Sequence, residues 1–132
     1  MRLEIERRHA IEDPSEMQVR SAIMALRSYG PSSFASLTDE NGNYLQVAGG
    51  AVTCLLERRD GGTNRHYRAY RDNPSTVFST GTALVFGGGQ VKLAADEWFT
   101  ASIVADAFLA FLRGEDLPAS IKWRDVTRIL NE

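Results

Sequence analysis

Apolar residues recur at helical spacing in two stretches of the chain. In the first, apolar side chains three or four positions apart share one helical face: Val19, Ala22, Ile23, Leu26 and Tyr29. The run 13–16 (Asp-Pro-Ser-Glu) predicts the start of this helix, with Asp13 as its cap and Glu16 at capping-box spacing. Gly30, followed by a proline, predicts its end.

The second helical stretch runs from about Thr100 to Arg113 and is apolar on most of its surface. Its polar stripe is narrow and consists of Ser102, Asp106 and Arg113. A helix of this kind must be covered on most sides, so we expect it to pack on a sheet. Gly114 follows directly and predicts the C-terminal cap.

A β-hairpin is predicted where residues 33–39 and 43–49 flank the tripeptide Glu-Asn-Gly. A three-residue loop with Gly42 in the left-handed conformation sets Leu37 opposite Leu45. A two-residue loop would instead set Leu37 opposite Gln46. Because one face of the hairpin must be buried, we expect the first register.

Strand-like patterns elsewhere predict further strands at residues 2–8, 52–56, 64–71, 82–86, 90–94 and 121–123. We interpret the charged segment 64–71 as an edge strand, since charges on an edge oppose pairing with other chains. Residues 121–123 are interpreted as another edge strand. The pattern predicts an α+β fold, with a mainly antiparallel sheet of about six or seven strands and two packed helices. We expect one domain over residues 1–132.

Composition and charge narrow the class of function. The chain has 15 Lys and Arg against 17 Asp and Glu, a formal charge of −2, which argues against a protein that binds nucleic acid through a basic face. We find neither an apolar run long enough for a membrane span nor the apolar core of a signal peptide. Cys54 is the single cysteine, so no disulfide can form within the chain. We therefore expect a cytoplasmic protein that binds neither membrane nor nucleic acid directly.

The residues that could carry chemistry are scattered along the chain. His9 and His66 lack a carboxylate at local spacing, and with one cysteine they do not form a zinc pattern. Cys54 lies in an apolar strand, where a small core residue is expected. The glycines at 87–89 precede a strand pattern rather than a helix, which predicts a hairpin turn and not a phosphate loop. We expect no catalysis, no cofactor and no metal site.

Carboxylates gather in the predicted loops, and they are the candidate binding residues. With a neighbouring tryptophan as an aromatic anchor, they are Asp39, Glu40, Asp60, Asp72, Asp96, Glu97 and Trp98. Such a surface could dock onto a protein with a basic, nucleic-acid-binding cleft.

The C-terminal third carries residues that suggest a family. A helix end, a Leu-Pro turn and a strand with a tryptophan are formed by Phe111-Leu112, Gly114, Leu117-Pro118, Ile121 and Trp123. Upstream, Gly42, Leu45 and Val47 lie on the predicted hairpin. In these residues and in the order of its elements, the chain resembles the first-numbered immunity protein family of bacterial polymorphic-toxin and contact-dependent-inhibition systems.

This resemblance implies a binding protein rather than an enzyme. Members of the family bind a cognate toxin domain and block it, and the toxins include nucleic-acid deaminases and nucleases. The resemblance therefore implies a cytoplasmic antidote whose partner is a toxin domain. The residues alone leave two alternatives: a small-ligand-binding or enzymatic α+β domain with a sheet-lined pocket, and an oligomerising structural domain. A concave pocket with convergent polar groups would favour the ligand-binding domain, and a flat or convex acidic face the immunity protein.

Overall fold

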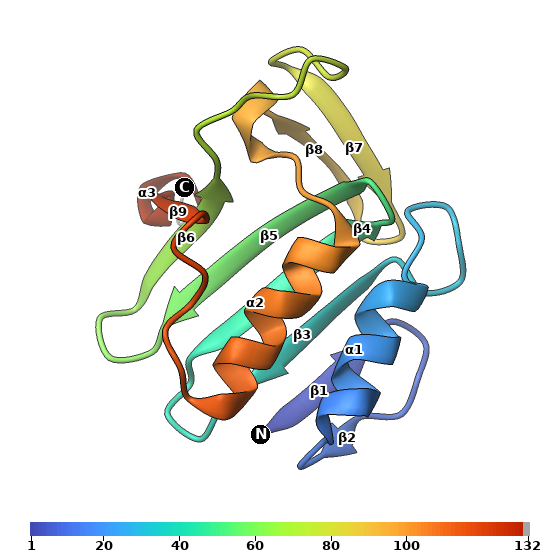
Figure 1. Cartoon of the computed structure of the whole chain (residues 1–132), viewed down its shortest axis with the longest axis vertical. Coiled ribbons are helices and arrows are strands. Elements are labelled where there is room, and N and C mark those ends of the chain that lie inside the picture. Colours follow the sequence, from blue (N-terminus) through green and yellow to red (C-terminus); the bar gives the residue numbers. More distant parts are fainter. Residues whose placement is uncertain (131–132) are drawn as a thin grey trace.

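A seven-stranded antiparallel sheet with two helices on one face forms the centre of the computed structural model, which describes residues 1–130 (Figure 1). In sheet order β2-β1-β3-β4-β5-β6-β9, its strands are β1 (Arg2–Ile5), β2 (Ile11–Glu12), β3 (Phe34–Thr38), β4 (Tyr44–Gly50), β5 (Thr53–Asp60), β6 (Arg65–Tyr70) and β9 (Lys122–Asp125). The remaining elements are α1 (Glu16–Ala25), the hairpin of β7 (Thr82–Phe86) and β8 (Gly89–Leu93), the 3₁₀ helix η1 (Ala95–Glu97), α2 (Ala101–Arg113) and the short α3 (Thr127–Leu130). The predicted α+β fold class is confirmed. Within residues 1–130, no helix combines the length and the apolar character needed to cross a membrane.

The predicted hairpin register is confirmed by β3 and β4. Leu37 lies opposite Leu45, and Gly42 has a positive φ of 79°. The side chain of Asp39 holds the turn, because its Oδ1 accepts hydrogen bonds from the backbone N–H groups of Asn41 at 2.8 Å and Asn43 at 3.0 Å. The turn is therefore built from the local residues that the sequence pattern singles out.

Helix α1 begins and ends at other residues than the sequence predicts. Its N-cap is Ser15, which forms a capping box with Gln18, rather than Asp13. It ends at Ala25, about one turn before Gly30, because Leu26 leaves the helical conformation and buries its side chain in the core. The backbone of β4 approaches this point so closely that a Cβ at Gly50 would lie 2.1 Å from the Leu26 carbonyl oxygen.

Two hydrophobic cores lie on opposite faces of the sheet. The larger one lies between the sheet and the two helices, with Phe108 of α2 fully buried in it. The smaller one lies where the β7–β8 hairpin covers one end of the other face, and its buried residues are Ala48, Leu55, Leu84, Leu93 and Trp98. Within residues 1–130, the rest of that face carries no helix (Figure 1).

The prediction that residues 64–71 form an edge strand is wrong. Strand β6 lies between β5 and β9, and β9 is the edge, as predicted for residues 121–123. The charges of β6 are paired across the sheet instead of guarding an edge: Arg68 lies 3.0 Å from Glu57, and Arg65 lies 2.8 Å from Asp125. Glu57 lies on the neighbouring strand β5 and Asp125 lies sixty residues from Arg65, so the local charge density of residues 64–71 does not reveal these partners.

Candidate functional site

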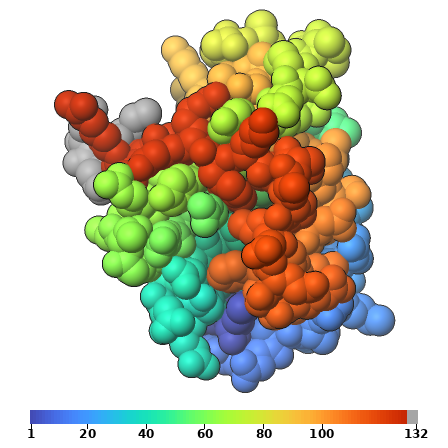
Figure 2. Space-filling model, turned by 60° about the vertical axis from the view of Figure 1, so that its left-hand side comes forward, coloured from blue at the N-terminus to red at the C-terminus, as the bar shows by residue number. Residues whose placement is uncertain are grey.

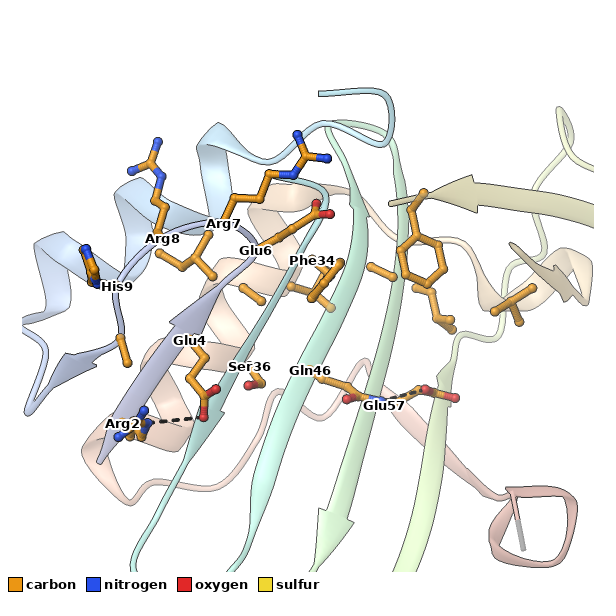
Figure 3. Close-up of a pocket in the computed structure, with 18 residues that line it drawn as sticks. Arg2, Glu4, Glu6, Arg7, Arg8, His9, Phe34, Ser36, Gln46 and Glu57 are labelled. Carbon is orange, nitrogen blue, oxygen red and sulfur yellow. Dashed lines mark hydrogen bonds and ion pairs between the residues drawn. The ribbon is translucent and has the colours of Figure 1, made fainter. Parts of the chain in front are cut away.

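A groove of about 640 Å³ lies on the sheet face that the helices leave uncovered. Its floor comes from β1, β3, β4 and β5, and its sides come from the segment 6–10 after β1 and from the β7–β8 hairpin (Figure 3). We call this hollow the sheet-face groove. It is the sheet-lined pocket that the ligand-binding alternative requires.

The polar part of the groove floor is a row of cross-strand neighbours. Ser36, Gln46 and Glu57 stand opposite one another on β3, β4 and β5. Gln46 Nε2 donates a hydrogen bond to Glu57 Oε1 at 3.1 Å, and Arg68 Nε donates to Glu57 Oε2 at 3.0 Å. Glu57 is thus engaged within the sheet, and this row does not present a free carboxylate to the groove.

The apolar part of the groove adjoins the hairpin. Phe34 of β3 is 37% exposed and meets Phe86 of β7 edge to face, with ring centroids 6.1 Å apart. Val91 of β8 and Ala48 of β4 complete this surface. An aromatic side chain left open in a concave surface is a typical anchor point for a ligand.

A buried serine connects the two sides of the groove. Ser33 Oγ donates a hydrogen bond to Glu6 Oε1 at 2.7 Å and accepts one from the Gly87 N–H at 2.7 Å. The hydrogen bonds that Glu6 accepts from the Ser33 hydroxyl and from the Ser33 backbone N–H hold the pKa of the Glu6 carboxyl below its ordinary value of 4.5. A Cβ at Gly87 would lie 2.2 Å from Glu6 Oε2 and 2.8 Å from Ser33 Oγ, so a larger residue there would displace these side chains. We call this arrangement the Glu6–Ser33–Gly87 clasp.

A second hollow, of about 570 Å³, lies at the end of the sheet where α2 ends. We call it the end pocket. It lies between the β3–β4 and β5–β6 turns on one side and the segment that follows α2 on the other. In Figure 2 the hollow is seen between the teal-to-green surface and the red-orange surface. Its lining includes the aromatic residues Tyr44, Phe111 and Trp123. The end pocket and the sheet-face groove share no lining residue.

Three of the sequence-predicted carboxylates lie at this end of the molecule. Asp39 and Asp60 line the end pocket together with Glu115 and Asp116, and Glu40 is exposed on the same turn as Asp39. We call Asp39, Glu40, Asp60, Glu115 and Asp116 the acidic end. The sequence shows the Glu115–Asp116 pair, but only the fold places it beside the strand turns.

Two arginines, Arg58 and Arg59, line the end pocket, and within residues 1–130 neither forms an ion pair with its carboxylates; Arg59 instead donates hydrogen bonds to Asn64 and to the Gly42 carbonyl. The guanidinium of Arg58 lies over the ring of Tyr67, 4.4 Å from its centroid, and over the ring of Trp123, 4.9 Å from its centroid. Its Nε is buried and has no hydrogen-bond partner among the described residues. Arg58 thus fixes the Trp123 ring in the wall of the end pocket.

Three other carboxylates that the sequence predicted for binding, Asp72, Asp96 and Glu97, lie away from the acidic end. Asp72 lies 2.8 Å from Lys122 at the opposite end of β6, and Asp96 lies 3.1 Å from Arg124. Glu97 is 4% exposed and pairs with Arg124 at 2.9 Å.

The expectation that Trp98 offers an exposed anchor is not met. Trp98 is 3% exposed because it stacks on Phe78 in the smaller core, with ring centroids 4.3 Å apart. Its neighbour Glu97 is buried because arginines of β6 and β9 neutralise it. Both outcomes depend on contacts between distant segments, which the local sequence does not show.

The potentially reactive side chains remain apart from one another. Burial raises the pKa of the Cys54 thiol to about 12, so the thiolate is disfavoured. His66 Nδ1 lies 3.3 Å from the Tyr44 hydroxyl, while His9 is exposed in the segment after β1. Among residues 1–130, no three His, Cys, Asp or Glu side chains come together as a metal site would require.

Comparisons with protein-family models, with curated proteins and with solved structures find no match to this chain. The family resemblance of the sequence is therefore not tested by relatives, and it stays a prediction.

Proposed function

We propose that this protein is an immunity protein that binds a cognate bacterial toxin domain and blocks its active site. The proposed toxin acts on nucleic acid, as a deaminase or a nuclease does. The observation that carries the proposal is the acidic end, which brings five carboxylates to one end of the molecule and leaves three of them, Glu40, Glu115 and Asp116, exposed. The residues that resemble the immunity family support the same function.

The physical basis is charge complementarity. An enzyme that holds nucleic acid needs a basic cleft for the phosphates. Glu40 and Asp116 are exposed and would present negative charge to such a cleft, and Trp123 in the pocket wall offers an aromatic surface beside them. Trp123 takes the anchor position that the sequence suggested for Trp98. Occlusion of this kind requires no bond-making by the immunity protein.

Co-expression tests the proposal directly. The toxin to test is a C-terminal toxin domain of a secreted protein, sought in the gene next to this one. We expect this chain to restore growth of cells that express that domain, and the two purified proteins to form a one-to-one complex in which the toxin is inactive. Failure to bind or protect against that domain would contradict the proposal.

A second experiment separates binding from catalysis. We expect the triple variant His9→Ala, His66→Ala and Cys54→Ser to protect cells as well as wild type, provided that circular dichroism shows it folded. A folded triple variant that no longer protects would indicate that one of these side chains takes part in chemistry.

A further inference from the structure

The sheet-face groove has positive charge that the fold leaves unpaired. Its carboxylates are engaged: Arg2 lies 3.3 Å from Glu4, while Glu57 and Glu6 are held as described above. Arg7 and Arg8 are exposed, and among the described residues neither side chain forms a hydrogen bond or an ion pair, although Arg7 lies close enough to Glu6 to help lower the pKa of that carboxyl. Figure 3 shows both arginines on the segment that borders the groove.

The apolar part of the groove lies beside this cationic side. Phe34 is on β3, which lies beside β1 in the sheet. Its partly exposed ring faces Phe86 of the hairpin. The clasp ties the segment after β1 to the tip of the hairpin, so the arginines and the two rings are held in one frame. A ligand that fits this surface has an apolar side chain next to negative charge.

We propose that the sheet-face groove binds an acidic segment of a protein partner, in which an aromatic or aliphatic residue is followed by carboxylates. The apolar residue lies against Phe34 and Phe86, and the carboxylates pair with Arg7 and Arg8. The half-buried hydroxyl of Ser36, which makes no side-chain hydrogen bond within the described chain, faces the backbone of the segment. This site prefers negative charge, whereas the acidic end prefers positive charge.

The proposal is independent of the toxin-binding function. The groove and the end pocket share no lining residue, so each can be changed by substitutions that do not touch the other. If the groove does not bind the acidic peptide, the immunity proposal is unaffected. If the protein does not bind a toxin domain, the groove proposal is unaffected.

The test is a titration of the full, ¹⁵N-labelled chain with a short peptide, followed by amide chemical shifts. The probe is an acetylated and amidated pentapeptide with one phenylalanine followed by two aspartates, flanked by glycines. We expect saturable shifts confined to the segment 6–10, Phe34 and the hairpin, with a Kd of about 1 mM or lower. The same peptide with lysines in place of the aspartates should bind at least tenfold more weakly.

Variants locate the site. The double variant Arg7→Ala/Arg8→Ala should weaken peptide binding at least fivefold, and so should the single variant Phe34→Ala. The control variants Arg20→Ala on α1 and Glu40→Lys at the acidic end should leave peptide binding unchanged. Equal binding of the lysine peptide, unchanged binding by the double arginine variant, or shifts outside the groove would overturn the proposal. Tighter binding of octanoate than of the peptide at the same residues would also overturn it, because the site would then belong to a small carboxylate.

Discussion

Single side chains hold the two sides of the sheet-face groove together. Ser33 is fully buried and uses its hydroxyl both as donor and as acceptor in the Glu6–Ser33–Gly87 clasp. A buried polar group that loses its partner costs about 1–3 kcal/mol. The clasp is therefore important for the stability of this face as well as for its shape.

Removing the Ser33 hydroxyl tests how much the clasp contributes to the free energy of unfolding. We expect Ser33→Ala to lower the free energy of unfolding by about 1–3 kcal/mol, because both Glu6 and the Gly87 N–H lose a partner. Ser36→Ala, on the floor of the groove, is the matched control and should change stability by less than about 0.5 kcal/mol. Urea denaturation of the two variants gives the comparison, and equal stability of the two would show that the clasp contributes little.

The Glu6 carboxylate should also make stability depend on pH. Its hydrogen bonds from Ser33 hold its folded pKa below the ordinary value of 4.5, so the stabilisation is present above pH 4.5 and is lost as the pH falls through the folded pKa. Glu16 and Asp125, whose pKa values are lowered by Arg113 and Thr127 respectively, add to the same trend. We expect the urea midpoint of Glu6→Gln to fall less than that of wild type between pH 7 and pH 3. An identical fall in both proteins would exclude a role for Glu6.

The buried cysteine predicts chemical inertness. Cys54 is 1% exposed and its pKa is raised to about 12, while the thiolate is the form that attacks disulfide reagents. At pH 8 we expect no labelling by an aromatic disulfide reagent in the folded protein and one thiol per chain in urea. Rapid labelling without denaturant would mean that the strand containing Cys54 opens readily.

At the scale of elements, α2 carries the main core. Phe108 is fully buried between the helix and the sheet. We expect Phe108→Ala to lower the free energy of unfolding by about 3–5 kcal/mol, as is usual for a large buried aromatic residue. Ser102→Ala on the exposed side of the same helix is the control and should melt like wild type. A thermal melt of Phe108→Ala that matches wild type would remove α2 from the core.

The elements that the sequence predicts well are those with local determinants. The β3–β4 register follows from the three-residue turn and from the need to bury one face, and α2 follows from its apolar periodicity and Gly114. The end of α1 could not be predicted, because it depends on Leu26 meeting Gly50 of a distant strand. The interior position of β6 likewise depends on β9, which lies more than fifty residues further along the chain.

At the scale of the whole molecule, the acidic end is only partly visible in the sequence. Asp39, Glu40 and Asp60 could be named because antiparallel hairpins expose their turns. Their proximity to Glu115 and Asp116, and the separation of Asp72 from them, follow from how the segment after α2 returns to the sheet. The sheet-face groove could not be predicted, since its two sides come from segments about eighty residues apart in sequence.

Affinity for the cognate toxin domain, measured after charge reversal, tests the central claim most directly. The variant is Glu40→Lys with Asp116→Lys, both exposed, whereas Asp39 is retained because it holds the β3–β4 turn. We expect binding to weaken at least tenfold, about 1.4 kcal/mol, partly through a slower on-rate, with a smaller difference at high salt. Asp72→Lys at the other end of β6 should bind within twofold of wild type. Binding of the double variant within twofold of wild type at low salt, or an equal loss in Asp72→Lys, would contradict toxin docking at the acidic end.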